Sequence, residues 1–190
     1  SILGADPSST SRCLRSRAST EEILKSGSAR ATIIRVPMVL GETDRASFAL
    51  AKRASSKRVI LFRAESLEQP IYAGDVVEAM QRRLTVPVTE TKTFDLAGPE
   101  SLPRRELVTR AAATLNRMPK IWSVPLPFGL MLAGVAQALM KRPPLTASML
   151  SLLDHDDAID PQPTARELGI TLTSLDTMLR CCVVNRLAQV

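Results

Sequence analysis

One apolar stretch, ATIIRVP, constrains the fold of this chain more than any other feature. Residues 31–36 are largely β-branched or aliphatic, and Pro37 follows them directly. β-Branched side chains favour strands and proline cannot donate to a sheet's hydrogen-bond ladder, so we expect a buried strand that ends before Pro37. Open parallel sheets bind ligands just beyond the carboxyl ends of their strands, which makes the loop from Pro37 to Gly41 a candidate binding loop. A plain strand-exit turn would have the same sequence.

Strand-like and helix-like segments alternate along the chain. The clearest helical pattern is 101–117, where we expect Ser101 to cap the helix and Pro103 to lie in its first turn. This alternation predicts an α/β fold with a parallel sheet up to about residue 100, and a mainly helical chain beyond it. The other expected helices are 44–55, 69–84 (entered through an extended Gln-Pro-Ile-Tyr), 127–142, 144–153 and 172–184, and the other extended segments are 58–63, 92–100 and 120–126.

The segment RCLRSRASTEEILKSGS, residues 12–28, contains an unusual pair. Cys13 and Arg17 are four residues apart, so they would share one face of a helix. Where that helix starts is ambiguous. The polar cluster at 8–11 could cap it and place both residues inside, or a Ser19-x-x-Glu22 capping box could start it later and leave both in a loop.

Composition limits the classes of function. The chain has 190 residues and a formal net charge of +6, with basic residues that are scattered rather than clustered. Without aromatic stacking residues or a known motif, this scatter argues against nucleic-acid binding, although a dinucleotide or an acidic lipid surface is compatible with it. The three cysteines do not form a disulfide framework, so we expect a reducing compartment. This predicts a cytoplasmic location, free or at the periphery of the inner membrane.

Two further segments have a plain and a functional interpretation. Residues 127–140 are strongly apolar but shorter than the roughly 20 residues of a membrane-spanning helix. We expect a buried or groove-lining helix there, with contact to a membrane surface or a protein partner through 127–153 as the alternative. The run DHDDAID, residues 154–160, holds the chain's one histidine, and consecutive residues rarely converge on one ion, so we expect a charged loop and no metal site.

Six segments, taken in order, resemble the C-terminal half of an atypical extended short-chain dehydrogenase/reductase of the NAD-dependent epimerase/dehydratase superfamily. They are SILGAD, CLRSRASTEEIL, TIIRVPMVLGETDR, QPIYAGDVVEAM, FDLAGPESLPRRELV and VPLPFGLM. The resemblance is strongest to the complex I 39-kDa-subunit-like NAD(P)-binding proteins and runs from Ser1 to about Gly169. It implies that residues 1–100 form the second half of a Rossmann-like parallel sheet domain, and that residues 101–190 form a mainly helical substrate or partner lobe.

The resemblance implies catalytic roles for the first residues. In the family, a serine or threonine ends one strand, and the helix that follows carries Tyr-x-x-x-Lys, with tyrosine as acid/base and lysine as ribose ligand. Ser1 falls at the serine position, Cys13 at the tyrosine and Arg17 at the lysine. A thiolate cannot donate a proton, and an arginine can contact a ribose or phosphate but cannot supply a titrating amine. We therefore expect weak or absent dehydrogenase chemistry.

The resemblance also assigns ligand contacts. Val36, Pro37 and Met38 would line the nicotinamide side of an NAD or NADP site, and Gln69 and Tyr72 would face an unknown small-molecule substrate. The family's glycine-rich phosphate loop is absent from these 190 residues and would lie upstream of them. We expect an NAD(P)-binding protein with a structural or assembly role and little turnover. The alternatives are an NAD-dependent sugar-nucleotide epimerase/dehydratase or reductase, and a membrane- or partner-binding module.

Overall fold

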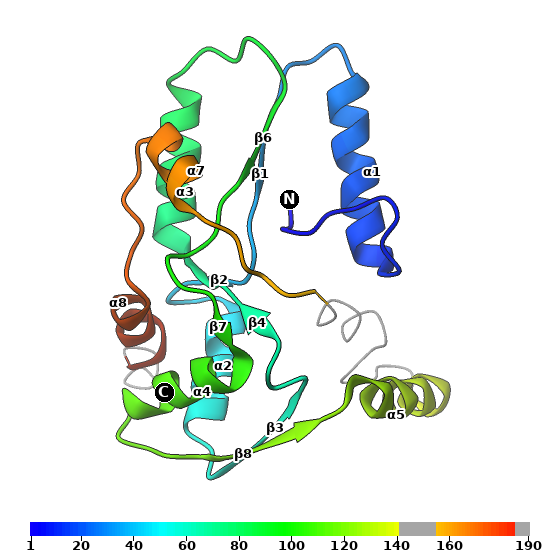
Figure 1. The fold of residues 1–190 in the computed structure, drawn as a ribbon, viewed down its shortest axis with the longest axis vertical. Coiled ribbons are helices and arrows are strands. Elements are labelled where there is room, and N and C mark those ends of the chain that lie inside the picture. Colours follow the sequence, from blue (N-terminus) through cyan, green and yellow to red (C-terminus); the bar gives the residue numbers. More distant parts are fainter. Residues whose placement is uncertain (141–154, 185–190) are drawn as a thin grey trace.

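The upper part of the fold in Figure 1 is a parallel sheet between helices. A computed structural model describes residues 1–140 and 155–184. The strands β1 (Thr32–Arg35) and β6 (Lys92–Asp95) pair in parallel. The helix α1 (Arg12–Ser26) lies on one side of this pair, and α3 (Ala73–Leu84) and α7 (Gln162–Leu168) lie on the other (Figure 1). The predicted α/β class with parallel strands is confirmed.

The first residues of the chain extend this sheet. Ile2 forms a parallel bridge with Val36. The backbone N–H of Leu3 donates to the Val36 carbonyl at 3.0 Å, and the Val36 N–H donates to the Ser1 carbonyl at 3.2 Å. Residues 1–3 therefore lie beside the exit of β1, which confirms the strand end that was predicted for SILGAD.

The lower part joins segments that are far apart in sequence. The strand β3 (Arg58–Phe62) pairs in parallel with β8 (Lys120–Val124), and α2 (Arg45–Ala54) packs on α4 (Arg104–Ala113). The short helix α8 (Leu175–Leu179) runs on into a π-helical turn, η2 (Arg180–Val184), which also packs on α2. Two short pairs complete the strands: β2 (Val39–Leu40) with β5 (Ile71–Tyr72), parallel, and β4 (Leu67–Glu68) with β7 (Leu102–Pro103), antiparallel.

Two hydrophobic clusters hold these parts together. The larger one is formed by α2, β3, α4, α8 and η2, and the smaller one lies between β6, α3 and α7. The larger cluster combines residues from both sides of residue 100, so α2 and β3 share their core with the helical remainder of the chain. Its members include Leu50, Leu61, Val108 and Met178, and those of the smaller cluster include Ala79, Phe94 and Leu168.

Local signals account for the elements that were predicted well. The helix expected at 44–55 is α2, and Oδ1 of Asp44 caps it by accepting from the Ser47 N–H at 2.9 Å. The strands expected at 31–36, 58–63 and 92–100 are β1, β3 and β6, and the extended segment expected at 120–126 is β8. The helix expected at 127–142 is α5 (Leu126–Leu139).

Two predicted helices differ from the structure, and one helix was not predicted. The helix expected at 101–117 begins only at Arg104, because Leu102 and Pro103 pair with β4 as β7. Ser101 therefore does not cap it, and its hydroxyl instead donates to the Asp157 carbonyl at 2.6 Å. The helix expected from 172 begins at 175, after a Ser174 cap, and its end is π-helical. The helix α7 was missed, and the helix expected at 144–153 lies outside the residues that the structure describes.

The apolar helix α5 raises the question of membrane insertion. Over residues 1–140 and 155–184, no helix has both the length and the apolar character that crossing a bilayer requires.

The close approach of two loops at Gly98 gives a test of the fold. A Cβ at Gly98 would lie 1.8 Å from the backbone oxygen of Pro70, which cannot move aside as a flexible side chain could. We expect Gly98→Ala to lower the free energy of unfolding by about 2–3 kcal/mol, measured by urea denaturation. Gly134→Ala is the matched control, because no described atom lies within 4 Å of the Cβ it would add in α5. An equal effect of the two substitutions would contradict this packing.

Candidate functional site

A cavity of about 230 Å³ opens at the carboxyl end of β1. One wall is apolar and comes from residues 1–3, the first turn of α1 and the β1 exit. The rest of the lining is a polar wall that comes from β4, the start of α4 and the segment that follows residue 154. The apolar wall consists of Ile2, Leu3, Leu14, Pro37 and Met38, and the polar wall of Glu68, Arg104, His155 and Asp157.

A buried ion pair forms the base of the polar wall. A carboxylate oxygen of Glu68 lies 2.5 Å from both Nε and Nη2 of Arg104, and each side chain is only 9% exposed. Nη1 of Arg104 donates to the Phe62 carbonyl at 2.9 Å. All three nitrogens of this guanidinium are therefore engaged inside the protein, and the two charges cancel.

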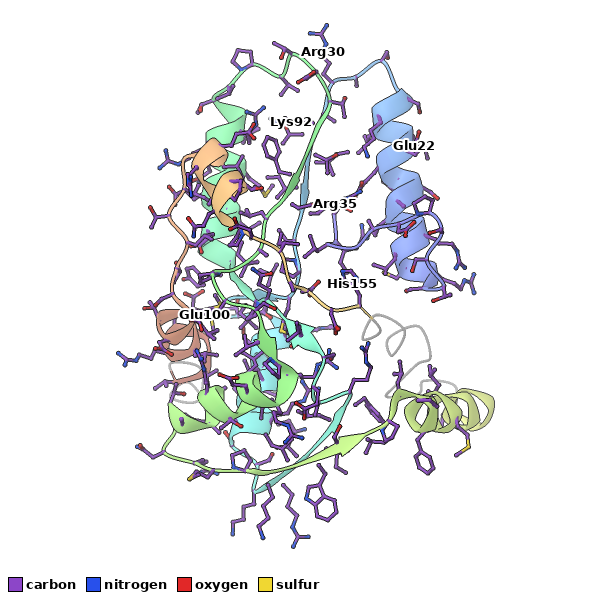
Figure 2. All side chains as sticks on the ribbon, viewed as in Figure 1. Glu22, Arg30, Arg35, Lys92, Glu100 and His155 are labelled. Atoms are coloured by element: carbon purple, nitrogen blue, oxygen red, sulfur yellow. The ribbon has the colours of Figure 1, made fainter. Side chains whose placement is uncertain are left out.

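Asp157 and His155 complete the polar wall. Nε2 of His155 lies 3.6 Å from Oδ1 of Asp157. Burial raises the pKa of the Asp157 carboxyl to about 6, although the neighbouring His155 works against this shift. The imidazole rests on Gly4, where a Cβ would come within 2.5 Å of Nε2 and where the φ angle of +76° also favours glycine. Figure 2 shows His155 between the N-terminal segment and the lower part of the fold.

The helix α1 settles the ambiguity about Cys13 and Arg17. It begins at Arg12, directly after Ser11, so both residues are helical and the later start at Ser19 is wrong. Cys13 is half-buried and Arg17 is exposed. The α1 residue that lines the cavity is Leu14, and neither Cys13 nor Arg17 does.

The predicted cofactor residues lie on or beside the apolar wall. Pro37 and Met38 line the cavity, which agrees with the binding loop that was predicted beyond the end of β1. Val36 is half-buried and packs against the smaller hydrophobic cluster, and Ser1 is exposed, paired through its backbone with Val36. The exit of β1 therefore brings two of the four predicted cofactor residues, Pro37 and Met38, to the cavity, and Val36 and Arg17 do not line it.

The predicted substrate residues are engaged with the protein itself. Gln69 is 1% exposed; its Nε2 donates to the carbonyls of Gly98 and Ile159 at 2.8 and 2.9 Å, and its Oε1 accepts from the Ile159 N–H at 2.9 Å. The Tyr72 hydroxyl bonds to Glu42, and this bond, together with burial, raises the pKa of Tyr72 to about 12. Neither side chain lines the cavity.

An ion pair docks α1 onto the sheet. Nε and Nη2 of Arg35, in β1, contact the two carboxylate oxygens of Glu21 at 2.9 and 2.6 Å, and Glu21 is 2% exposed. Arg35 lies between β1 and α1 in Figure 2. The bond to Arg35 holds the pKa of Glu21 below its ordinary value, although burial opposes this. This pair sets where Leu14 and the rest of α1 lie relative to Pro37.

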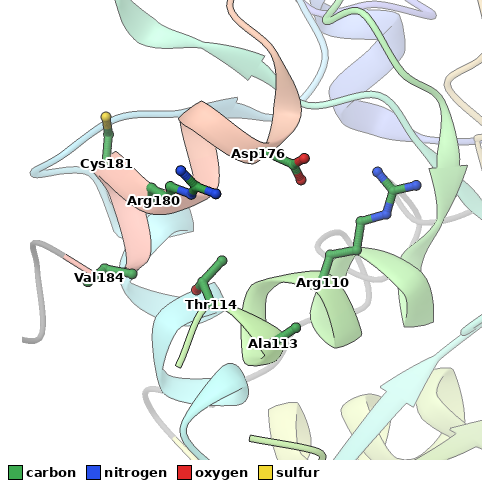
Figure 3. Close-up of a pocket in the computed structure, with 7 residues that line it drawn as sticks. All are labelled: Arg110, Ala113, Thr114, Asp176, Arg180, Cys181 and Val184. Atoms are coloured by element: carbon green, nitrogen blue, oxygen red, sulfur yellow. The ribbon is translucent and has the colours of Figure 1, made fainter. Parts of the chain in front are cut away.

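A wider hollow of about 610 Å³ lies elsewhere, between α4 and the α8–η2 segment (Figure 3). Arg110 on its rim forms ion pairs with Glu100 and Glu106, with nitrogen-to-oxygen distances of 2.8 and 2.9 Å. Cys181 also borders it, and none of the residues predicted for cofactor or substrate does. We therefore take the cavity at the end of β1 as the candidate site.

No sequence pattern predicts the polar wall. DHDDAID is the expected charged loop, yet this loop returns to β4, where Oδ1 of Asp156 accepts from the Leu67 N–H at 3.1 Å across 89 positions of sequence. No local sequence pattern predicts such a contact. In the part of the chain that the structure describes, no group of three or more His, Cys, Asp or Glu side chains is placed to hold a metal ion.

These parallel strands, with helices on both sides and a cavity at a strand's carboxyl end, define a Rossmann-like α/β protein. Solved short-chain dehydrogenase/reductase structures have the same fold. A human epimerase family protein solved with NADPH is 19% identical, with a TM-score of 0.62 over 91% of this chain and 55% of that one. The Bordetella bronchiseptica enzyme WbmH in complex with NAD+ is 14% identical, with a TM-score of 0.64 over 97% and 54%.

Sequence comparison gives more specific relatives. The chain is 27% identical over 172 residues to the mitochondrial 40 kDa subunit of NADH-ubiquinone oxidoreductase from Neurospora crassa, covering 90% of this chain. It is 25% identical over 181 residues to the mitochondrial NADH dehydrogenase [ubiquinone] 1 alpha subcomplex subunit 9 of Arabidopsis thaliana, covering 93%. The predicted resemblance to the complex I 39-kDa-subunit-like proteins is confirmed. The chain spans about half the length of these relatives, 45% of each, and no protein-family model matches it.

The Glu21–Arg35 pair predicts how stability depends on pH. Because the folded-state pKa of Glu21 lies below its ordinary 4.5, its contribution is present above that value and is lost as pH falls through the folded pKa. We expect Glu21→Gln to lower the free energy of unfolding by roughly 3 kcal/mol near pH 7, with the difference shrinking in acid. Glu22→Gln is the matched control, since its side chain is exposed on the same helix (Figure 2). A pH-independent difference in urea denaturation would contradict this role.

Proposed function

We propose that this chain is part of an NAD(P)-binding protein of the short-chain dehydrogenase/reductase type, with a structural or assembly role and little or no turnover. The observation that carries the proposal is the apolar wall at the β1 exit, where Pro37 and Met38 meet Leu14. A flat nicotinamide ring suits such an apolar wall, and the place matches the crevice beyond the strand ends where open α/β sheets bind ligands. Two proteins of the same fold are solved with NADPH and NAD+.

The residues of this chain would contribute the nicotinamide end of the site. Pro37 and Met38 would exclude water from one face of the ring, and Arg17, exposed one turn after Cys13, would contact the ribose or a phosphate. A bound dinucleotide would supply a nicotinamide that accepts or donates hydride. Cys13 would be a weaker proton donor than a tyrosine hydroxyl, which supports little turnover. Ser1 would lie at the strand end beside this site.

The two residues predicted to contact substrate have different roles on this proposal. Gln69 would hold in place the segment that contains Ile159, because its side-chain amide is hydrogen-bonded to backbone groups. Tyr72 would stay protonated at neutral pH, since its pKa is raised to about 12.

For the domain division, we propose that the lobe predicted at 101–190 also includes α2 and β3, which share its core. The cytoplasmic location stays a prediction, and both curated relatives are named as mitochondrial.

Cofactor binding is testable through the apolar wall. In a fluorescence titration of the natural-length protein with NADPH, we expect saturable binding that Met38→Lys weakens about tenfold or more, because a charge cannot be desolvated there. Met118→Lys is the matched control, since Met118 is 94% exposed. Circular dichroism would verify that both variants fold. Absence of saturable binding to the unmutated protein would rule out the cofactor, and turnover gained by Cys13→Tyr/Arg17→Lys would identify a decayed enzyme instead of a structural protein.

A specific surface favours a second function, assembly with a protein partner. On the outer face of the β3–β8 pair, Ile60 lies opposite Trp122, and these side chains are 67% and 63% exposed. Arg58 lies opposite Lys120 on the same face. Like charges opposite each other destabilise a strand pair, and exposed Trp, Met and Arg are typical of protein interfaces. The apolar α5, which was predicted to contact a partner through 127–153, follows β8 directly, with Phe128 57% exposed.

This second role predicts a change in assembly. We expect the natural-length protein to migrate in a large complex on native gels of cell extracts, and Ile60→Ser/Trp122→Ser to release it as a smaller species because the apolar contact is lost. Ile23→Ser is the matched control, since Ile23 is 70% exposed on α1, away from this face. Migration of the unmutated protein as a free subunit would contradict the role. Loss of binding to anionic vesicles in the double variant, with assembly unchanged, would identify a membrane contact instead.

A further inference from the structure

The polar wall lines the same cavity as the apolar wall to which the nicotinamide is assigned above, so the inference that follows rests on the proposed function. The polar wall would contact a second ligand, bound beside the nicotinamide. The cavity measures about 230 Å³, which is below the roughly 300–1,000 Å³ of sites for drug-sized ligands. The space therefore fits a compact molecule.

The charges on the polar wall disfavour an anionic ligand. Sugar nucleotides carry a diphosphate, which proteins hold with the fork of an arginine or with free backbone amides. Arg104 is the arginine of this wall, and Glu68 and the Phe62 carbonyl already use all three of its nitrogens. Glu68 offsets the charge of Arg104, only two of the arginine's five N–H groups are left over, and Asp157 would repel a diphosphate whenever it is ionised.

The segment that carries His155 and Asp157 is held firmly in place. The Asp157 N–H donates to the Leu67 carbonyl at 3.1 Å, and the Asp157 carbonyl accepts from the Ser101 hydroxyl at 2.6 Å. Ile159, two residues after Asp157, forms hydrogen bonds to the side chain of Gln69 through both its N–H and its carbonyl. All of these anchors to Asp157 and Ile159 use the backbone, so the Asp157 side chain has no anchoring task.

The two side chains are arranged to share a ligand atom. Their separation of 3.6 Å is too long for a strong direct hydrogen bond, and it leaves each group able to bond one oxygen that lies beside both. Asp157 is 18% exposed at its side chain and lines the cavity. The charged groups that act on it are His155, Asp156, Glu68 and Arg104, and burial is the largest influence.

We propose that the cavity takes a compact, uncharged molecule that presents a carbonyl or hydroxyl oxygen, and that His155 and Asp157 bind this oxygen while the apolar wall covers the rest. A neutral Asp157 carboxyl donates to a carbonyl oxygen, and an ionised one only accepts. Since its pKa is raised to about 6, the donating form predominates below that pH. Binding of a ketone therefore weakens as pH rises through this value.

The probe is 1-indanone, a small uncharged ketone, measured by saturation-transfer NMR on the natural-length protein with NADPH present. We expect saturable binding that weakens about fivefold or more between about pH 5 and pH 7.5. Asp157→Leu should weaken it about tenfold at the lower pH, because the donor is lost. Asp157→Asn should bind with little pH dependence, because its amide donates at every pH and the backbone anchors are kept.

Asp160→Asn is the matched control, because Asp160 is exposed, does not line the cavity, and its bond to the Gln162 N–H is one that an asparagine oxygen also makes. It should behave as the unmutated protein does. Saturable binding of UDP-glucose in competition with the ketone would overturn the proposal, as would ketone binding that none of the Asp157 variants changes. NADPH binding is measured separately. Absence of NADPH binding would refute the proposed function, whereas absence of ketone binding alone would refute only the assignment of the polar wall.

Discussion

The buried ion pair between Glu68 and Arg104 is the interaction on which the site depends. Breaking a buried pair by removing one partner leaves an uncompensated charge, which costs several kcal/mol. Here the pair joins β4 to the start of α4, and the further bond from Arg104 to the Phe62 carbonyl ties in the end of β3. It forms part of the cavity lining and offsets the charge of the arginine of that wall.

The apolar wall depends on how α1 is docked. The bidentate contact between Glu21 and Arg35 fixes α1 against β1, and the parallel bridge between Ile2 and Val36 fixes the segment before it. Together they bring Leu14 to Pro37 and Met38. The cavity is thus apolar where it meets the sheet and polar where it meets the lower part, which is the arrangement that suits a flat ring on one side and a polar group on the other.

The same fold carries many functions, so the fold alone does not decide what this chain does. Its cavity supports cofactor binding, whereas the exposed Ile60 and Trp122 of the β3–β8 pair support assembly. The two proposals are compatible, because the cavity lining and the exposed strand face share no residue. A protein with a cofactor site and weak catalytic groups can serve as a subunit that the cofactor stabilises, since a ligand that binds only the folded state adds to stability.

The sequence by itself determined the α/β class, the strand that ends before Pro37, the helix that begins next to Asp44 and the place of Pro37 and Met38 beyond the end of that strand. These follow from local causes: β-branched side chains favour strands, proline ends them, and an aspartate oxygen satisfies the first N–H groups of a helix. Only the tertiary structure decided the start of α4, because Leu102 and Pro103 are drawn into a strand by β4. It also decided the polar wall, because Asp157 and His155 reach β4 and Gly4 through contacts that span most of the chain. Such contacts depend on how distant segments pack, and a local pattern of residues does not encode them.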